Sequence, residues 1–223
     1  MEQINKLRIY KERRGKKTNL YTKSILPGTK FFAEKTIKYQ GEEYREINPE
    51  RSKLGAAILK GLSQTGIKEG STILYLGASH GYTPSFISDI VGPDGFVFCL
   101  DFAPRVLRDL VFVCEARENM APLLENAIMP EDYKDKVPQV DVVYQDIAQR
   151  DQIGIFLSNC DAFLKQGGFG LLAVKPRSID VTRKPKDIFK EIRTKLEARL
   201  TIVDYKELDP YEMDHAFFVV KKK

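Results

Sequence analysis

Residues 71–101 read STILYLGASHGYTPSFISDIVGPDGFVFCLD. Two apolar runs, 72–78 and 95–102, are rich in β-branched and aromatic residues, and an amphipathic stretch at 83–91 lies between them. The pattern predicts a strand, a helix and a second strand. Because parallel strands need a long crossover connection, this stretch indicates one unit of a parallel sheet.

The same alternation continues to the end of the chain. We expect strands at 121–126, 140–147, 169–176, 200–208 and 215–222, and helices at 104–117, at 151–166 (closed by Gly167 and Gly168) and at 184–199. Strands separated by helices predict an α/β, Rossmann-like domain with a seven-stranded, mostly parallel sheet. The short loop LDPYEMD (208–214) leaves no room for a helix, so the last two strands should form an antiparallel hairpin. A terminal hairpin of this kind is typical of class I methyltransferases and not of an ordinary dinucleotide-binding fold.

The first 50 residues have a different pattern. Short alternating runs at 6–10, 19–26, 31–39 and 42–47 favour β-strands. We therefore expect a small N-terminal β domain over residues 1–50 and a second domain over 51–223. The second domain should begin with a helix from near Pro49 to near Gly66, because Leu54, Ala57, Ile58 and Leu62 have helical spacing.

Composition excludes several classes of protein. The chain has 223 residues, 43% of them hydrophobic and 30% charged, which favours a folded globular protein over a disordered one. Three widely spaced cysteines without a CxxC pair indicate a reducing compartment, hence the cytoplasm, and argue against structural zinc. No apolar run reaches the length of a membrane span or forms the core of a signal peptide, so we expect no membrane association.

Charge is unevenly distributed. Residues 1–60 contain 15 basic and 7 acidic side chains, a net charge of +8, whereas the remaining residues contain 21 and 24, a net charge of −3. A basic segment beside a nearly neutral body is consistent with binding to a polyanion or to an acidic protein surface. A charged surface that only contacts solvent would give the same distribution of charge.

Polar residues follow successive predicted strands. Ligands of open α/β sheets bind at the carboxyl ends of the strands, so these positions are candidates for a site. Gly77 and Ala78 open a glycine-containing loop without the G-x-G-x-x-G spacing, and Asp101 lies 24 positions after Gly77, where an acid can accept hydrogen bonds from ribose hydroxyls. With Asn126 and Asp146 at the next two strand ends, the arrangement favours an adenosyl cofactor over unrelated helix caps.

A lysine and a histidine are candidates for chemistry. Lys175 ends the fifth strand and could activate a hydroxyl beside Asp146, although a lysine can also simply extend from the core to solvent. His215 begins the last strand, where a lone histidine is more often structural, and His80 receives no role. Neither histidine has metal-ligand spacing, so no metal is predicted.

Five stretches together resemble the fibrillarin family. These are YREINPERSKLGAAILKG, ILYLGASHGYTPSFISDIVGPDG, VYQDIAQRDQ, VKPRSIDVT and LDPYEMDHA, and the similarity extends over essentially the whole chain. Fibrillarins are ribose 2′-O-methyltransferases of box C/D guide ribonucleoproteins. Without a Gly/Arg-rich N-terminal tail, this sequence is similar to the archaeal form.

The resemblance implies an activity and a set of residues. It implies methyl transfer from S-adenosyl-L-methionine to rRNA and tRNA, with a tetrad of catalytic residues at Lys53, Asp146, Lys175 and His215. Cofactor contacts are implied at Tyr82, Thr83, Asp101, Phe102, Asn126, Ala127, Asp146, Ile147, Ala148 and Gln149. Implied partners are a guide RNA, a Nop-domain scaffold protein and a kink-turn-binding protein of the ribosomal type.

The sequence departs from the family pattern in three respects, the third of which affects two stretches. The loop reads GASHGYT where GAASGTT is usual, Asn126 replaces an Asp, and AQRDQ and VKPRS replace AQPDQ and VKARS. Two other functions compete with a methyltransferase. A non-catalytic RNA–protein scaffold is opposed by the intact tetrad, and a nucleotide-dependent oxidoreductase is opposed by the glycine spacing and the terminal hairpin.

Overall fold

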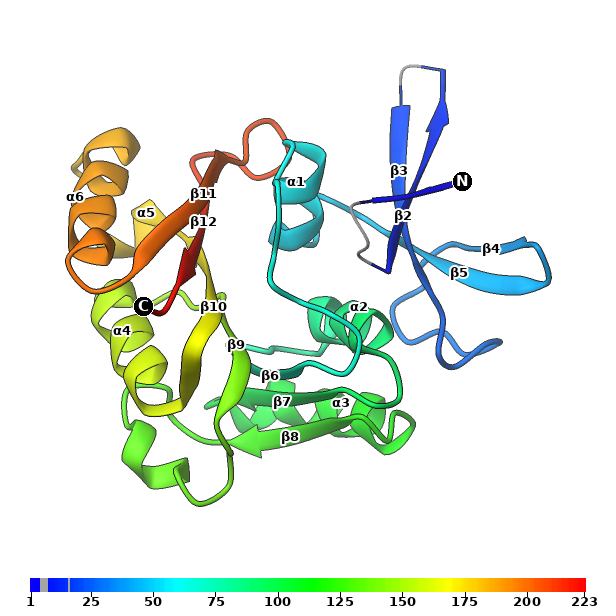
Figure 1. Ribbon diagram of the computed structural model, residues 1–223, viewed down its shortest axis with the longest axis horizontal. Helices are drawn as coiled ribbons and strands as arrows, with labels where there is room; N and C mark the ends of the chain where they lie inside the picture. Colours follow the sequence, from blue (N-terminus) through cyan, green and yellow to red (C-terminus); the bar gives the residue numbers. More distant parts are fainter. Residues whose placement is uncertain (5–7, 16) are drawn as a thin grey trace.

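The computed structural model describes residues 1–4, 8–15 and 17–223, which form two sheets (Figure 1). The N-terminal sheet is antiparallel, with the strand order β1-β2-β3-β5-β4. Its strands are β1 (Glu2–Gln3), β2 (Ile9–Arg14), β3 (Lys17–Lys23), β4 (Thr36–Tyr39) and β5 (Glu42–Ile47). The predicted β character of this segment is confirmed, although positions 6 and 7 of the first predicted strand lie outside the described residues.

The second sheet has seven strands in the order β11-β12-β10-β9-β6-β7-β8. They are β6 (Thr72–Leu76), β7 (Phe96–Asp101), β8 (Met120–Leu124), β9 (Val140–Gln145), β10 (Leu164–Val174), β11 (Thr201–Glu207) and β12 (Ala216–Lys221). Strands β6 to β10 pair in parallel, and β12 is antiparallel to both β10 and β11. The predicted mostly parallel sheet with an antiparallel C-terminal hairpin is confirmed.

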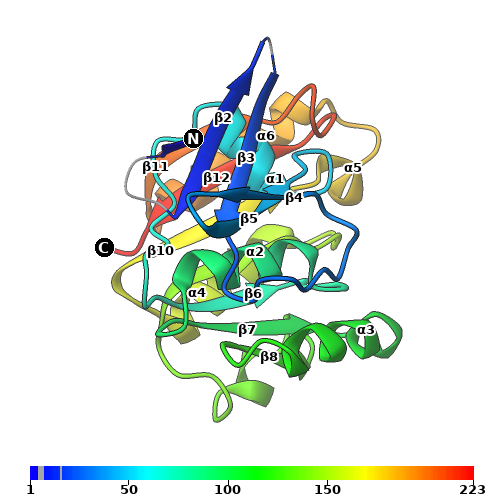
Figure 2. The ribbon, with the colours of Figure 1, turned by 90° about the vertical axis from the view of Figure 1, so that its right-hand side faces the viewer.

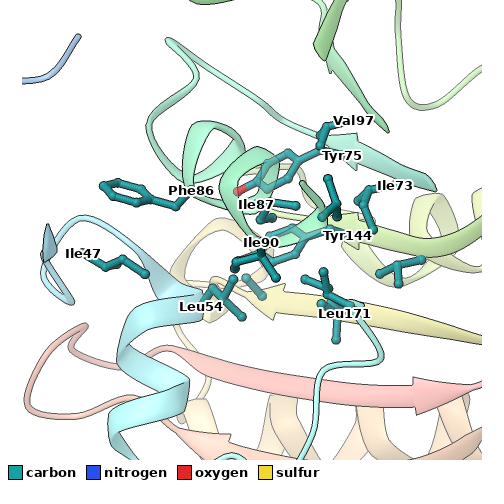
Figure 3. Packing of buried hydrophobic residues seen from close by; sticks show 14 of the residues in the cluster. Ile47, Leu54, Ile73, Tyr75, Phe86, Ile87, Ile90, Val97, Tyr144 and Leu171 are labelled. Carbon is teal, nitrogen blue, oxygen red and sulfur yellow. The ribbon is translucent and has the colours of Figure 1, made fainter. Parts of the chain in front are cut away.

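Helices cover both faces of the seven-stranded sheet (Figures 1 and 2). One core contains α1 (Lys53–Leu59), α2 (Tyr82–Val91) and α3 (Pro104–Glu115), and the other contains η1 (Pro130–Tyr133), α4 (Gln152–Phe163) and α6 (Pro185–Glu197). Successive strand residues alternate between the two cores, as pleated geometry requires. Figure 3 shows the first core, where Tyr75 and Tyr144 lie among side chains of α1 and α2. Their rings stack with centres 4.3 Å apart.

Two predicted elements are longer than the observed ones. The predicted helix from Pro49 to Gly66 is too long: Ser52 Oγ accepts from the Gly55 N–H at the start of α1, and Gly61, at φ +83°, follows its end. The predicted strand at 31–39 forms only as β4. The segment 31–35 is not a strand, and Ala33 has a positive φ of 54°.

The glycine pair at 167–168 was assigned the wrong role. It does not close α4, which ends at Phe163, but lies within β10. The register of β10 against β9 shifts between Leu164 and Phe169, so the two glycines occupy an irregularity of the strand. A short helix, α5 (Pro176–Ile179), also follows β10 directly and was not predicted.

Buried charges join the N-terminal sheet to the part of the fold that contains the seven-stranded sheet. We name Glu34, Arg45, Asp89 and Arg117 the junction cluster; all four side chains have zero exposure. Arg45 lies 2.7 Å from both Glu34 Oε1 and Asp89 Oδ2, and Arg117 Nη1 lies 2.9 Å from Asp89 Oδ1. Thr22 of β3 donates to Asp89 at 2.8 Å. Since Asp89 belongs to α2, these contacts fix the N-terminal sheet against the α2 face.

No helix within the described ranges of the chain has the length and apolar character needed to cross a membrane.

Candidate active site

Three members of the predicted tetrad meet directly. Asp146 follows β9, Lys175 follows β10 and Lys53 is the first residue of α1. The Lys53 ammonium lies 3.3 Å from Asp146 Oδ2, and the Lys175 ammonium lies 2.8 Å from Oδ1. The Lys53 contact is a hydrogen bond, whereas the Lys175 contact is an ion pair without hydrogen-bond alignment at Oδ1. The side chains are 12–22% exposed, so the cluster is sheltered but open to solvent.

The two lysines determine the charge state of Asp146. Burial alone would raise the pKa of its carboxyl group, but the positive charges of Lys53 and Lys175 outweigh burial and lower that pKa below its ordinary value. Asp146 is therefore ionised at neutral pH. It is a strong hydrogen-bond acceptor and a weak base.

His215 joins the other three residues through Glu212, which sequence reasoning missed. The two oxygens of Glu212 lie 3.7 Å from Lys53 Nζ and 3.8 Å from His215 Nδ1. Glu212 is in the loop between β11 and β12, within the stretch LDPYEMDHA that the resemblance already used. An acid three residues before His215 was the available signal, but only the fold brings it to Lys53.

A pocket of about 280 Å³ lies beside Asp146 and Lys175, at the carboxyl ends of β6, β7 and β9. Nine residues predicted for cofactor binding line it: Gly77, Asp101, Phe102, Asn126, Ala127, Asp146, Ile147, Ala148 and Gln149. The lining also includes Ser79, Leu100, Ile128 and Ile155, which were not predicted. The site therefore lies where an open α/β sheet is expected to bind its ligand.

Gly77 and Asp101 shape the inner end of this pocket. Gly77 has φ +82°, and a Cβ at this position would lie 2.4 Å from the Asp146 carbonyl oxygen, so only glycine allows the close approach of the two strand ends. Asp101 is buried and accepts from the N–H groups of Ser79 at 2.8 Å and Ala103 at 3.0 Å. Each carboxylate oxygen retains a further lone pair for a ligand hydroxyl.

Three residues predicted for cofactor binding lie outside the pocket walls. Ala78 is buried in the core beneath the loop. The Tyr82 hydroxyl accepts from the Asn48 N–H at 3.0 Å, and the guanidinium of Arg51 lies 4.1 Å from the centre of its ring. Thr83 donates to Ser52 Oγ at 3.2 Å. Through these contacts Tyr82 and Thr83, the first residues of α2, hold Asn48 and the N-cap residue of α1, Ser52, in place.

A buried glutamine supports Lys175 and was also missed. Gln152, at the start of α4, donates to the Lys175 carbonyl at 2.9 Å and accepts from the Lys175 N–H at 3.0 Å. Gln145 donates to the Gln152 carbonyl at 2.6 Å. These bonds fix the backbone of Lys175, where β10 ends and α5 begins, and so direct its side chain toward Asp146.

The residues present fit an adenosyl cofactor. Phe102 and Ile128 both line the pocket and are 63% and 51% exposed, so they offer apolar surface to a flat base. Asp101 offers carboxylate oxygens suited to ribose hydroxyls. Within the described part of the chain, no group of three or more His, Cys, Asp or Glu residues is placed to hold a metal ion.

The fold and this site define a Rossmann-like methyltransferase architecture. The fibrillarin family model matches residues 2–223, and the chain belongs to the fibrillarin family. It is 52% identical over 201 residues to the fibrillarin-like rRNA/tRNA 2′-O-methyltransferase of Thermococcus onnurineus, covering 90% of this chain and 89% of the relative.

Solved fibrillarins have the same fold. Aeropyrum pernix fibrillarin, crystallised with natively bound S-adenosyl-L-methionine, matches with a TM-score of 0.89 and 42% identity over 98% of this chain and 96% of its own. A fibrillarin in complex with Nop5p matches with a TM-score of 0.87 and 36% identity over the full length of both chains.

Proposed function

We propose that this chain transfers a methyl group from S-adenosyl-L-methionine to ribose 2′-hydroxyls of rRNA and tRNA, as the catalytic subunit of a box C/D ribonucleoprotein. The observation that supports this most strongly is the position of Asp146, ionised between two lysines at the wall of a pocket suited to the cofactor. Relatives named for this activity support it as well.

The chemistry requires alignment above all. The cofactor, when bound, supplies a methyl group already activated by a sulfonium, so the protein must chiefly hold the ribose oxygen in line with it. Asp146 accepts a hydrogen bond from the 2′-hydroxyl, and Lys175 donates one to the same oxygen. Lys53 keeps Asp146 ionised, and His215 orients the ribose. Only RNA carries this hydroxyl.

The lowered pKa of Asp146 is compatible with this role. A weak base cannot remove a proton from a free hydroxyl, whose pKa is far higher. As the new C–O bond forms, however, the hydroxyl proton becomes strongly acidic. An ionised carboxylate that already accepts a hydrogen bond from this hydroxyl can then take the proton. Asp146 therefore orients the nucleophile first and receives the proton late in the transfer.

Placement of the RNA depends on partners. Positive charge is concentrated in residues 1–60 and the remainder is net negative, so we expect residues 61–223 to bind an RNA backbone weakly without partners. A Nop5-type scaffold, a kink-turn-binding protein and a box C/D guide RNA supply the placement, and the guide selects the target nucleotide by base pairing.

Methyl transfer into a guide-matched RNA tests the proposal. Radiolabelled S-adenosyl-L-methionine is supplied to the chain alone and to the chain with its partner proteins and guide. We expect cofactor binding by both, but efficient methylation only in the assembled complex and only at the guide-matched nucleotide. Sequence-selective methylation by the chain alone would contradict the need for partners, and no transfer by the complex would contradict the activity.

A further inference from the structure

The loop between β11 and β12 is tied to two other parts of the site. The Leu208 N–H donates to the His215 carbonyl at 2.9 Å and closes the base of the loop. Lys60, directly after α1, donates to the Asp209 carbonyl at 2.8 Å, and Arg177 of α5 lies 2.9 Å from Asp214. The loop is thus held against the helix that carries Lys53 and the helix that follows Lys175.

Within this loop, the Glu212 carboxylate faces the Lys53 ammonium group and the His215 imidazole. Its side chain is 18% exposed, with Oε1 at 3.7 Å from the Lys53 ammonium and Oε2 at 3.8 Å from His215 Nδ1. Lys53 therefore lies between two carboxylates, those of Asp146 and Glu212. Without Glu212, the ammonium group would lose one of the two anions that define its position.

His215 has a hydrogen-bond pattern that selects one tautomer. Its Nδ1 lies 2.8 Å from the Met213 carbonyl oxygen, and a carbonyl oxygen can only accept a hydrogen bond. The Met213 carbonyl therefore favours a hydrogen on Nδ1. Glu212 Oε2 lies near the same nitrogen and favours a hydrogen there, whereas a lone pair on Nδ1 would be repelled by both oxygens.

We propose that Glu212 is a positioning residue that holds Lys53 and His215 together and keeps His215 as the Nδ1–H tautomer, leaving Nε2 to accept a hydrogen bond from the target RNA. This rests on the proposed function for its catalytic consequence. With 24% exposure, the imidazole can contact a ligand directly. Glu212 itself acts through Lys53 and His215, and no contact between it and the substrate is required.

Nitrogen-15 NMR of histidine-labelled protein tests the tautomer without any reaction. The chain has two histidines, and His80, on the surface beside Asp109, serves as the internal reference. At a pH where His215 is neutral, we expect a pyrrole-type shift for Nδ1 and a pyridine-type shift for Nε2. Glu212→Gln keeps the size of the side chain and removes its charge, and should move both shifts of His215 toward a mixture of tautomers. Glu207→Gln, at the end of β11, is the matched control.

Kinetics of the guide-assembled complex test the positioning role. We expect Glu212→Gln to lower kcat on the order of tenfold, the loss of one charge-assisted contact, with the KM for S-adenosyl-L-methionine unchanged. Glu212→Asp, which retains the charge, should recover part of the loss. Circular dichroism and cofactor affinity show whether each variant is folded.

The possible outcomes separate the two proposals. An Nε2–H tautomer in the unmodified protein, or unchanged shifts and kcat in Glu212→Gln, would overturn the role of Glu212. Absence of methyl transfer by the unmodified complex would instead overturn the proposed function, and the NMR result would still decide the tautomer.

Discussion

The junction cluster and the active site contain similar charged groups but differ in their access to solvent. In the junction cluster, Arg45 and Asp89 have zero exposure, and their charges are paired with protein groups on both sides of the boundary between the sheets. In the site, Asp146 and His215 are 15% and 24% exposed and lie at or near a pocket. Burial with mutual pairing makes a charge cluster structural, whereas partial exposure leaves lone pairs and hydrogens available for a substrate.

The same difference explains why pKa directions alone do not identify the functional cluster. The pKa of Glu34 is lowered, because the charge of Arg45 and hydrogen bonds outweigh a burial that would raise it, and the pKa of Asp146 is lowered in the same way by Lys53 and Lys175. A perturbed carboxyl group is available to a ligand only where its side chain is also exposed at a pocket, and the Glu34 side chain has zero exposure although the residue lines another pocket. Asp146 meets this condition and lines the pocket together with Lys175.

Removing Lys175 should give the largest effect on activity. We expect Lys175→Ala to lower methyl transfer by the guide-assembled complex by about 10²–10⁴-fold, with cofactor affinity nearly unchanged and Tm close to that of the unmodified chain. Lys165→Ala is the matched control, because Lys165 lies near the opposite end of β10 and pairs with Asp141 on the surface. Turnover near normal in Lys175→Ala would remove this residue from the mechanism.

Neutralising Asp89 should affect stability instead. Asp89→Asn leaves Arg45 and Arg117 without their shared buried anion, so we expect the free energy of unfolding to fall by about 3–5 kcal/mol, or Tm by roughly 10 °C. Thermal unfolding measures the change, and Asp94→Asn, on the surface after α2, is the control. If Asp89→Asn unfolds at the same temperature as the control, the junction cluster does not fasten the two sheets.

Removing Lys53 should change the pH dependence of Asp146. Because its folded-state pKa lies below its unfolded value, ionised Asp146 stabilises the fold above the unfolded pKa of about 3.9, and this contribution is lost as pH falls through the folded pKa. In Lys53→Met, Asp146 stays buried but loses one neighbouring positive charge, so the pKa of its carboxyl group in the folded state should rise. Its contribution to stability should then disappear at a higher pH. Carboxyl ¹³C NMR titration measures the shift, and an unchanged titration of Asp146 would show that Lys175 alone controls it.

The smallest effect is expected at the exposed rim of the pocket. Asn126 Oδ1 accepts from the Ile128 N–H at 3.1 Å. Asn126→Asp preserves this acceptor and adds a charged oxygen for the adenine amino group, so S-adenosyl-L-methionine should bind about fivefold tighter, or about 1 kcal/mol, and Asn126→Ala should weaken it similarly. Titration calorimetry decides this. If neither variant changes the dissociation constant of S-adenosyl-L-methionine from that of the unmodified chain, this strand end does not contact the base.

An equivalent change at a buried position next to the junction cluster sharpens the comparison, because Ser88, which accepts from Arg117, also bonds Asn119. Asn119 is buried and donates to the carbonyls of Ser88 and Gly92. Asn119→Asp would lose both donors and bury an additional charge, whereas Asn126→Asp occurs at an exposed position. We expect Asn119→Asp to destabilise the fold and Asn126→Asp to leave Tm unchanged, because only the side chain at position 119 is buried away from solvent.

Much of the fold could be predicted from periodicity. Apolar and alternating runs located all seven strands of the second sheet. The inner strands β6, β7, β9 and β12 are mostly buried, as a sheet covered on both faces requires, whereas the edge strands β8 and β11 are mostly only partly buried. Predictions failed where local pattern and tertiary packing disagree. The stretch 49–66 has helical spacing throughout, but Gly61 ends the helix, and Gly66 packs so closely against Phe169 that a Cβ would lie 2.2 Å from its ring.

For the site, the sequence by itself determined which polar residues lie at the carboxyl ends of the strands, because strand order in the chain and parallel pairing place those ends at one edge. Asp101, Asn126 and Asp146 follow from this rule alone, and the family resemblance supplied Lys53 and the catalytic role of His215. Only the tertiary structure decided which charges pair. Glu212 contacts Lys53 across more than 150 residues of sequence, and Asp89 of α2 joins Arg45 of the N-terminal sheet to Arg117 in the segment between α3 and β8. A periodic pattern records which face of an element is apolar, but electrostatic pairing depends on distances between elements, and those distances exist only after the chain has packed.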